Sequence, residues 1–548
     1  MSIEIEKEIE KETQLRSVAS SAMRFSIGTL FSRITGMLRE QTMAFFFGTS
    51  PFIAAFLIAT RFALMLRRLL GEGALLTGFI PQFEAKRVEG EEKANDFFQK
   101  THSSLSWFLI FLLLIVECGL FCLWKTEIFS RENREIILMM MMILPSLFFV
   151  CLYALCSALL QCRKNFFLPA TAPAIFNLTS VAFVIWIGSS WNKYVIIGLA
   201  VSTLIAYILQ WALLVPLSYR AFREFFRSFR WNEKFLELGG LLKSVSLTAL
   251  GLGSVQINGF LDTLFARHAS LEGPTYLYYA MRLNQLPLAL IGVAISSALL
   301  PSLSKAFKEQ NLAHFQSLLS FCLQRVFTLI IPCTFAIFAL GLPAVVLVYY
   351  RGAFHEGSVL HTTLSLWGFG AGLLPMTVVL LLNQGFYAMQ EYRIPTRAAI
   401  FSVLCNLLLN MLFIWVLRLG AESVSIATSF AALFNVAFLL RKLVPHFRSF
   451  FCRETALLVL KLVAASLCAA SATLWIGRYF LSDGAWEILS QTAVCLPTSV
   501  GRQLLHFFAM FFLFAFFFFI AAHLLQLQKN FSFIRFLRKK KRPELKEE

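Results

Sequence analysis

Charge is scarce in this sequence. Only 15% of the 548 residues are charged and 58% are hydrophobic, with 59 phenylalanines and a mean hydropathy of +0.70. A soluble domain is usually about 25% charged and about 45–50% apolar, so this chain has more apolar surface than one core can hide. The excess apolar surface must face lipid, which excludes an ordinary soluble protein.

Motifs for catalysis and nucleotide binding are also missing. The sequence has no P-loop, no HExxH and no GxSxG elbow, and its eight histidines form no ligand pair. We therefore expect a protein that is not an enzyme, carries no cofactor and does not hydrolyse ATP. Energy for its work would come from an ion gradient or the membrane potential, with Na⁺ or H⁺ as the coupling ion.

Paired cysteines and a signal peptide are absent as well. The 11 cysteines are an odd number, and Cys151, Cys156 and Cys162 have neither CxxC spacing nor histidine partners. We expect them to be reduced residues of a membrane helix and not a metal site. Residues 1–14 are polar and rich in Glu, unlike the basic and then apolar start of a signal peptide. We expect residues 1–20 to form a cytoplasmic extension.

What the sequence does contain is a series of long apolar stretches. A membrane-spanning helix needs roughly 20 mainly apolar residues, and this length selects about 14 candidates. They lie near residues 22–47, 52–82, 104–124, 136–161, 168–188, 194–217, 241–267, 279–301, 326–350, 362–388, 395–417, 422–440, 455–477 and 504–527. The sequence therefore predicts an all-α, polytopic membrane protein. The alternating strand pattern of an outer-membrane barrel is absent.

Basic residues are concentrated in alternate loops. These loops cover 86–100, 163–164, 220–234, 305–308, 393–397 and 441–453, and a basic tail covers 531–548. The opposite loops hold single charges such as Lys193, Arg351 and Arg418. The positive-inside rule then predicts a bacterial inner-membrane protein with both termini in the cytoplasm. The net charge of +18 reflects this topology, and we expect no nucleic-acid partner.

An internal repeat is visible in two places. RFALMLRRLLGEGALLTGFIP at 61–81 resembles RLNQLPLALIGVAISSALLP at 282–301. Further along the chain, three residues of the first half recur in the second: Pro169, Asn177 and Trp186 as Pro395, Asn406 and Trp415. Spans 1–6 and 7–12 therefore look like two copies of one unit. Because six is even, both copies enter the membrane in the same direction, as in transporters that bind substrate between parallel repeats.

The repeat predicts the domain organisation. We expect an N-lobe over 21–219 and a C-lobe over 220–450, followed by an added pair of spans over 451–530. A groove for a long lipid chain is one explanation for a pair that stands outside the repeat.

Arginines inside apolar spans are the most informative residues. They are Arg33, Arg39, Arg61, Arg67 and Arg68 in the first two spans and Arg282 at the start of span 8. A charge at the bilayer centre costs roughly 2.5–3.5 kcal/mol on insertion scales, so these side chains must line a polar cavity or pair. Arginine binds phosphate oxygens bidentately, and a polyanionic ligand fits such a site best. The alternative is that some of them snorkel to the cytoplasmic surface.

Two acidic residues are candidates for ion pairing or gating. Glu72 lies four residues after Arg68, on the same face of a helix, so these two side chains can pair. Glu40 follows Arg39 directly, and we expect it to point elsewhere. Basic residues still outnumber acidic ones in this region, which predicts a net positive cavity.

Three glycines interrupt span 2 at Gly71, Gly73 and Gly78. They predict either a hinge that bends as access alternates or close helix packing by small residues.

A carboxylate and two amides form a further candidate site. Asp262 lies in span 7, and Asn406 and Asn410 lie one turn apart in span 11. Hard cations take oxygen ligands, so these three residues could bind Na⁺. The alternative is hydrogen bonding between helices.

Several of these motifs together resemble a known family. LFSRITGMLRE, MLRRLLGEGALLTGFIPQF, LPLALIGVAISSALLPSLSKAF and the RGAF of residues 351–354 are similar to the MurJ/MviN lipid II flippases. That family belongs to the multidrug/oligosaccharidyl-lipid/polysaccharide exporter superfamily. The resemblance covers spans 1–12 in order and also fits the total of about 14 spans.

The resemblance implies a function. Lipid II, an undecaprenyl diphosphate that carries a disaccharide-peptide, would be turned outward for peptidoglycan synthesis by two lobes that alternate access to a cationic cavity. Spans 13 and 14 would form the groove for the polyprenyl tail. The family's cavity arginines fall on Arg33, Arg39, Arg67 and Arg282, and the sodium site of some members falls near Asp262, Asn406 and Asn410. Membrane lipids and cell-wall synthesis proteins are further expected partners, and we expect a monomer.

The chain departs from the family pattern at three positions. Ala54 and Met281 stand where acidic residues are expected, and Asn410 stands where an Asp can occur. These losses make the cavity more positive and put in doubt any gating salt bridge or ion coupling that uses those acids.

Four alternatives follow from the same residues. Within transporters, the chain could flip another polyprenyl-diphosphate glycan or export drugs, although an exporter of cationic drugs should carry acidic cavity residues. An enzyme acting on lipid phosphates needs a carboxylate, histidine or metal cluster, which is not found in the sequence. A channel needs a filter motif, which is not found either.

Replacing Arg39 by Ala should abolish function and leave membrane insertion intact, because the side chain lies inside an apolar span. Arg33→Ala and Arg282→Ala should behave in the same way. The measurement is complementation of cells depleted of their lipid II flippase, with membrane levels of each variant as the control. Normal growth with Arg39→Ala would count against a cavity role.

Overall fold

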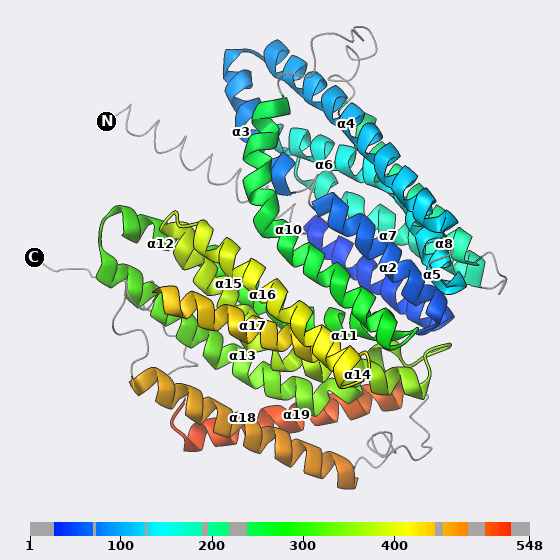
Figure 1. The fold of residues 1–548 in the computed structure, drawn as a ribbon. Helices are drawn as coiled ribbons and strands as arrows, with labels where there is room; N and C mark the ends of the chain where they lie inside the picture. Colours follow the sequence, from blue (N-terminus) through cyan, green and yellow to red (C-terminus); the bar gives the residue numbers. More distant parts are fainter. Residues whose placement is uncertain are drawn as a thin grey trace, which may run out of the picture. The chain divides into compact units, whose positions relative to one another are not determined.

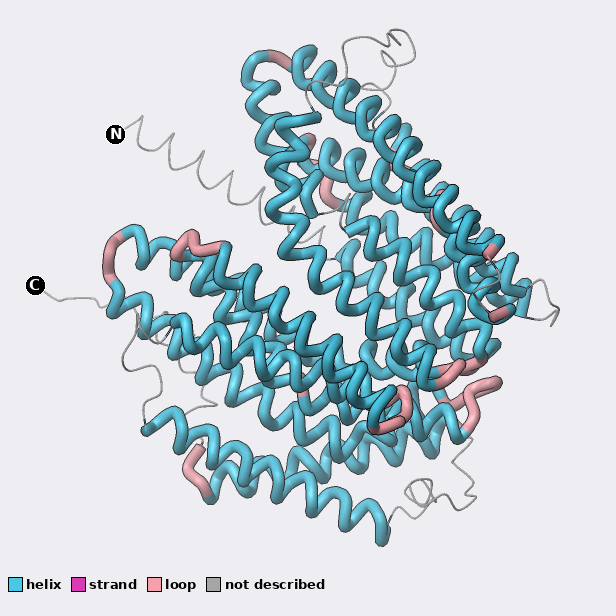
Figure 2. The backbone as a smooth tube through the Cα atoms, in the orientation of Figure 1, coloured by secondary structure: helices cyan, strands magenta, loops and turns pink. Residues whose placement is uncertain are grey.

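The computed structural model describes residues 27–68, 73–126, 130–188, 195–216, 218, 238–443, 453–480 and 499–527. Every regular element within these ranges is a helix, which confirms the predicted all-α class (Figure 2). The chain divides into two compact units, Met1–Leu261 and Asp262–Glu548. The predicted boundary between the lobes, at 219/220, lies outside the described residues.

The first unit contains seven complete described helices in addition to a helical stretch at 27–47. They are α2 (Pro51–Arg67), α3 (Gly73–Glu89), α4 (Glu91–Lys125), α5 (Arg131–Ile143), α6 (Ser146–Cys162), α7 (Phe167–Gly188) and α8 (Val195–Ala212). Helix α10 (Leu238–Ala269) begins in this unit and ends in the second (Figure 1).

The second unit continues with helices that run to the end of the described residues. They are α11 (Gly273–Pro287), the π-helix η2 (Leu288–Val293), α12 (Ala294–Lys308), α13 (Leu312–Tyr349), α14 (Glu356–Ala371), α15 (Leu373–Ala388), α16 (Arg393–Met411), the π-helix η3 (Leu412–Val416), α17 (Ser423–Leu443), α18 (Arg453–Phe480) and α19 (Val500–Leu524).

Each of the predicted spans falls on helical backbone where the residues are described. Nine helices in the described ranges are long and apolar enough to cross a membrane, and a tenth is obtained if the bent pair α14 and α15 counts as one span. The chain is therefore a multi-pass membrane protein, and the total of about 14 spans stays a prediction.

The second unit contains two irregular spans. Helices α14 and α15 meet at an angle of 41°, and Gly372 at the break lies against the side chain of Ser429. In the other span, α11 ends at Pro287 and continues as a π-helix before α12 begins. Proline has no N–H to donate to the preceding turn, and single π-turns inside α-helices often mark functional sites.

The added pair α18 and α19 packs against α13 (Figure 1). The contact is built from apolar residues that are almost fully buried, among them Leu462, Ala465, Met510 and Phe514. The opposite face of α19 exposes Phe508, Phe512, Phe516 and Phe519. An exposed face of four phenylalanines on a membrane helix is suited to lipid contact.

Charged groups outside the spans are paired locally. At the turn between α3 and α4, hydrogen bonds from Lys86 and Lys93 lower the pKa of Glu89. In the second unit, Glu422 directly before α17 pairs with His361 of α14. These pairs tie neighbouring helix ends together at the surface of each unit.

Some predicted features lie outside the described residues. They are the extension 1–20, the whole loop 220–237, Gly71, Glu72 and the tail 531–548. The Arg68–Glu72 ion pair is therefore still a prediction. Gly73 and Gly78 belong to α3, and the predicted hinge remains untested.

Gly273→Ala should destabilise the second unit. A Cβ at this position would lie 2.7 Å from the Cβ of Ala421 and closer still to the carbonyl oxygen of Ala266, so the helix ends must move apart. Overpacking of this kind usually costs about 1–3 kcal/mol. Thermal unfolding of the purified protein in detergent measures the effect. Gly357→Ala is the matched control, because a Cβ there meets nothing within 4 Å; equal unfolding temperatures for both variants would contradict the packing argument.

Candidate functional site

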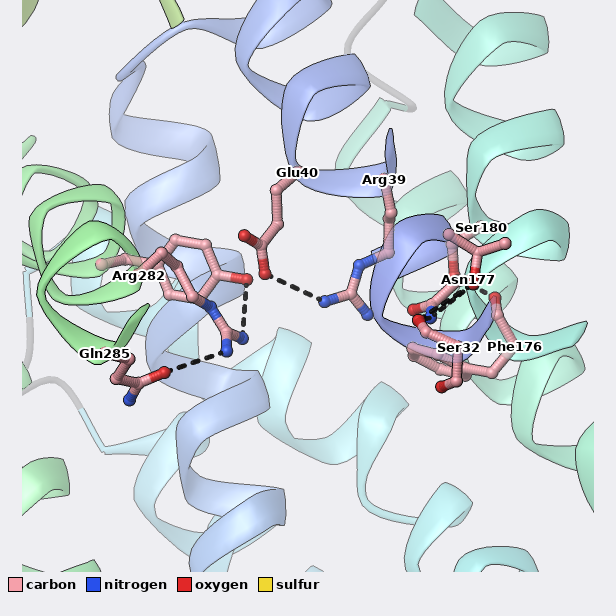
Figure 3. Close-up of polar contacts among 10 residues, drawn as sticks. Ser32, Arg39, Glu40, Phe176, Asn177, Ser180, Arg282 and Gln285 are labelled. Carbon is pink, nitrogen blue, oxygen red and sulfur yellow. Dashed lines mark hydrogen bonds and ion pairs between the residues drawn. The ribbon is translucent and has the colours of Figure 1, made fainter. Parts of the chain in front are cut away.

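Arg39 is held on the helical stretch 27–47 by two contacts (Figure 3). Its guanidinium lies 3.8 Å from the carboxylate of Glu40 and 5.2 Å from the centre of the Phe176 ring on α7. Both side chains of the ion pair are mostly buried, at 18% and 12% exposure. The expectation that Glu40 points away from Arg39 is thus wrong, because two long side chains on adjacent residues can bend toward each other. The pair and the aromatic face together lower the cost of a buried cation.

Asn177 on α7 fixes the same helix close to Arg39. Its side-chain amide donates to the backbone oxygen of Ser32 at 3.1 Å and to the hydroxyl of Thr35 at 3.3 Å. Gly36 lies beside the same amide, and a Cβ there would make an ordinary contact of 3.4 Å with the Asn177 amide nitrogen. Helix α7 therefore sets both the position of the helix and, through Phe176, the position of the Arg39 guanidinium.

The other arginines of the first unit lie in different surroundings. Arg33 and Arg68 are exposed, which suits contact with either a watery cavity or headgroups. The guanidinium of Arg61 lies against Gly259 of α10, where a Cβ would come within 2.6 Å of it. Gly259 is thus a residue that allows close approach, and the sequence interpretation missed it.

Arg67 lines a small pocket of the first unit, which encloses about 240 Å³ with its open mouth included. Four hydroxyl-bearing residues from α2, α6 and α8 share the lining: Thr60, Ser146, Thr203 and Tyr207. This polar lining explains how a guanidinium is accommodated among apolar helices.

Arg282 lies on α11 and is held by its own helix (Figure 3). Its guanidinium donates to the hydroxyl of Tyr278 at 3.2 Å and to the side-chain oxygen of Gln285 at 3.5 Å. It also lies 4.9 Å from the centre of the Tyr278 ring. These contacts fix the orientation of the planar guanidinium.

Asp262, Asn406 and Asn410 come together as the sequence predicts. The amide nitrogens of Asn406 and Asn410 lie 2.8 and 2.9 Å from one carboxylate oxygen of Asp262. Asn410 also donates to the side-chain oxygen of Asn406 at 3.0 Å, and Thr428 donates to the second Asp262 oxygen at 3.2 Å. Both asparagines are about 1% exposed. The cluster joins α10, α16 and α17.

The chemistry of this cluster fits a hard monovalent cation. It contains one carboxylate, two amide oxygens and a hydroxyl, and the side-chain oxygen of Asn410 is buried with no hydrogen bond among the described residues. Oxygen ligands suit hard cations. Among the described residues, no group of three His, Cys, Asp or Glu could hold a metal ion. The hydrogen-bond interpretation fits the same geometry.

Some of the contacts could have been found from the sequence. Tyr278 and Gln285 lie four residues before and three after Arg282, which is the spacing of neighbours on a helix face. Phe176 and Thr428 come from other helices, far along the chain, and no local signal marks them. The glycine and acidic candidates of span 2 outside the described residues remain without structural support.

The chain resembles one protein family over most of its length. The sequence model of the family described as Lipid II flippase MurJ matches residues 43–495. A Chlamydia trachomatis serovar D protein named probable lipid II flippase MurJ is 32% identical over 396 residues, or 72% of this chain and 73% of the relative. Its counterpart in Vibrio cholerae serotype O1 is 26% identical over 516 residues, or 91% of this chain and 96% of the relative.

Solved structures show the same fold. A structure of lipid II flippase MurJ in an inward closed conformation has a TM-score of 0.71 at 24% identity and covers 91% of this chain and 99% of that chain. An inward-facing multidrug resistance MATE family transporter of the MOP superfamily has a TM-score of 0.58 at 13% identity and covers 78% of this chain and 99% of that chain. At these identities, the likeness establishes the architecture.

Asp262→Ala should destabilise the second unit, because it leaves the donors of Asn406 and Asn410 without their shared acceptor. Leaving buried polar groups unsatisfied costs about 1–3 kcal/mol. Thr428→Val removes one hydrogen bond and should cost less, about 0.5–1.5 kcal/mol. Thermal unfolding in sodium-free buffer ranks the two variants. The reverse order would show that the carboxylate does not organise the cluster.

Proposed function

Because the chain belongs to the MurJ family of lipid II flippases, we propose that it moves lipid II from the cytoplasmic to the periplasmic leaflet of a bacterial inner membrane. Transport, and not catalysis, is then its activity. The expected substrate is an undecaprenyl diphosphate with a disaccharide-peptide head. Both termini would lie in the cytoplasm, as the distribution of basic loops predicts.

The observation that carries this proposal is the set of contacts around Arg282. The Arg282 guanidinium, on a membrane helix, is oriented by a tyrosine hydroxyl and ring and by an amide oxygen. A cation kept in this way is suited to the two negative groups of a diphosphate, which arginine binds bidentately. Arg39, held by Phe176 and Glu40, would supply a second cationic contact in the first unit.

The transport cycle follows from the same residues. Alternating access by the two repeats would expose the arginines first to one side of the membrane and then to the other. The break at Gly372 and the π-helix after Pro287 offer places in the second unit where helices can bend, in addition to the predicted hinge at Gly71, Gly73 and Gly78. Helices α18 and α19 would accept the polyprenyl tail.

We propose that sodium is the coupling ion. Asp262, Asn406, Asn410 and Thr428 would hold Na⁺, which would neutralise the buried carboxylate. Because Asp262 belongs to α10 and both asparagines to α16, binding would link the packing of these two helices to the sodium gradient. The energy of that gradient is then available without ATP.

Arg282→Gln should slow the appearance of lipid II at the outer face by about tenfold to a hundredfold, since a hydrogen bond to a charged group contributes about 1.5–3 kcal/mol. The measurement is accessibility of lipid II at the outer face of cells depleted of their own flippase and supplied with the variant. Arg418→Gln, a loop arginine, is the control and should leave the rate unchanged. Normal exposure of lipid II with Arg282→Gln would exclude the cavity role of Arg282. If the unchanged protein brings no lipid II to the outer face, the flippase function is excluded.

Asn410→Asp should lower the sodium concentration needed for half-maximal flipping, because it adds a second carboxylate to the cluster. Asp262→Asn should remove the dependence on sodium. Flipping in proteoliposomes with a gradient of NaCl or KCl tests both variants. Equal rates in the two salts for the unchanged protein would refute sodium coupling and leave the flippase proposal intact.

A further inference from the structure

A long apolar cavity lies inside the second unit. It encloses about 650 Å³ of empty space, its open mouth included, between α13, α15, α17 and α18. Its walls include Leu323 and Phe327 of α13, Leu374 and Val378 of α15, and Leu433 and Val436 of α17. No described residue of α19 lines it, so the cavity is separate from a groove between α18 and α19.

The bend between α14 and α15 adjoins this cavity. Leu374, Pro375 and Val378 belong to the first turns of α15, directly after the 41° break. If the span were straight, these first turns of α15 would continue along the axis of α14. The bend changes their direction, and the cavity lies beside them.

The cavity extends across the membrane, from the middle of the span α17 toward one membrane surface. On α17 the lining extends from Leu433 to Leu440, three residues before the helix ends at Leu443. Seven residues of helix cover roughly 10 Å, whereas one leaflet of the hydrocarbon core is roughly 15 Å thick. The cavity therefore covers most of the depth of one leaflet, which is the depth that an acyl chain occupies.

Polar and basic residues gather at the surface end of the cavity. Ser320 and Thr455 line it there, and the Gln324 side chain donates to the Thr455 hydroxyl at 3.1 Å. The adjoining helix ends carry Arg441 and Lys442 on α17 and Arg453 on α18, all exposed. The positive-inside rule places this end in the cytoplasm, where anionic lipid headgroups attract Lys and Arg.

We propose that this cavity holds one acyl chain of an anionic phospholipid from the cytoplasmic leaflet. The acyl chain would fill the space between the apolar walls. The ester region of the lipid would contact Ser320 and Thr455, and its phosphate would lie near Arg453. Such a resident lipid would join the added pair of helices to the rest of the unit, because α18 forms one wall. The inference goes beyond the proposed transport function and does not depend on it.

The experiment uses the full-length protein reconstituted with a phosphatidylglycerol that carries a photoreactive group in one acyl chain. After illumination, mass spectrometry should find the label on peptides that contain residues 320–327 and 433–440. Val436→Trp should abolish this labelling by filling the cavity. Leu408→Trp is the matched control, because residue 408 is 64% exposed on α16, and it should leave the labelling unchanged.

Two comparisons make the result decisive. Phosphatidylcholine with the same reactive chain should label these peptides less than phosphatidylglycerol does, and Arg453→Gln should reduce that difference. If Val436→Trp fails to give a monodisperse protein, Leu440→Phe replaces it. Labelling that the filling variant leaves unchanged, or labelling of these peptides by a photoreactive polyprenyl diphosphate in preference to phosphatidylglycerol, would overturn the proposal.

Discussion

The structure depends on accommodating guanidinium cations among membrane-spanning helices that are otherwise apolar. Each such charge is costly at the bilayer centre, and the two best-defined arginines are accommodated in different ways. Arg39 lies against an aromatic ring from another helix and beside a carboxylate, whereas Arg282 is held by tyrosine and glutamine of its own helix. In both cases the neighbours fix the orientation of the planar group, which a diphosphate ligand requires.

The internal repeat is also a repeat of contacts. Asn177 and Asn406 occupy corresponding places in the two halves of the sequence, and each bonds from span 5 of its repeat to span 1. Asn177 reaches a backbone oxygen and a threonine hydroxyl, but Asn406 reaches the carboxylate of Asp262. The corresponding contact is therefore a neutral hydrogen bond between helices in the first unit. In the second unit it is part of a charged cluster whose oxygens suit a cation.

Much of the site could be predicted because polar residues in apolar spans have few explanations. Asp262, Asn406 and Asn410 stand out for this reason, and the structure brings them together. The same logic selects the arginines. It fails for Phe176 and Thr428, since an aromatic or a threonine in a membrane helix is ordinary, and for Glu40, whose direction depends on side-chain bending and not on helix periodicity.

Composition and the spacing of apolar stretches were enough to establish an all-helical, multi-pass membrane protein, because the lipid core permits so few ways of satisfying a backbone. Short motifs were enough to indicate its family. Only the folded chain decided which ring covers Arg39 and how Gly259 admits Arg61. It also decided where α15 bends and where the apolar cavity lies. These features arise from contacts between helices far apart in sequence, and the strength of such contacts depends on distances that no local pattern of residues encodes.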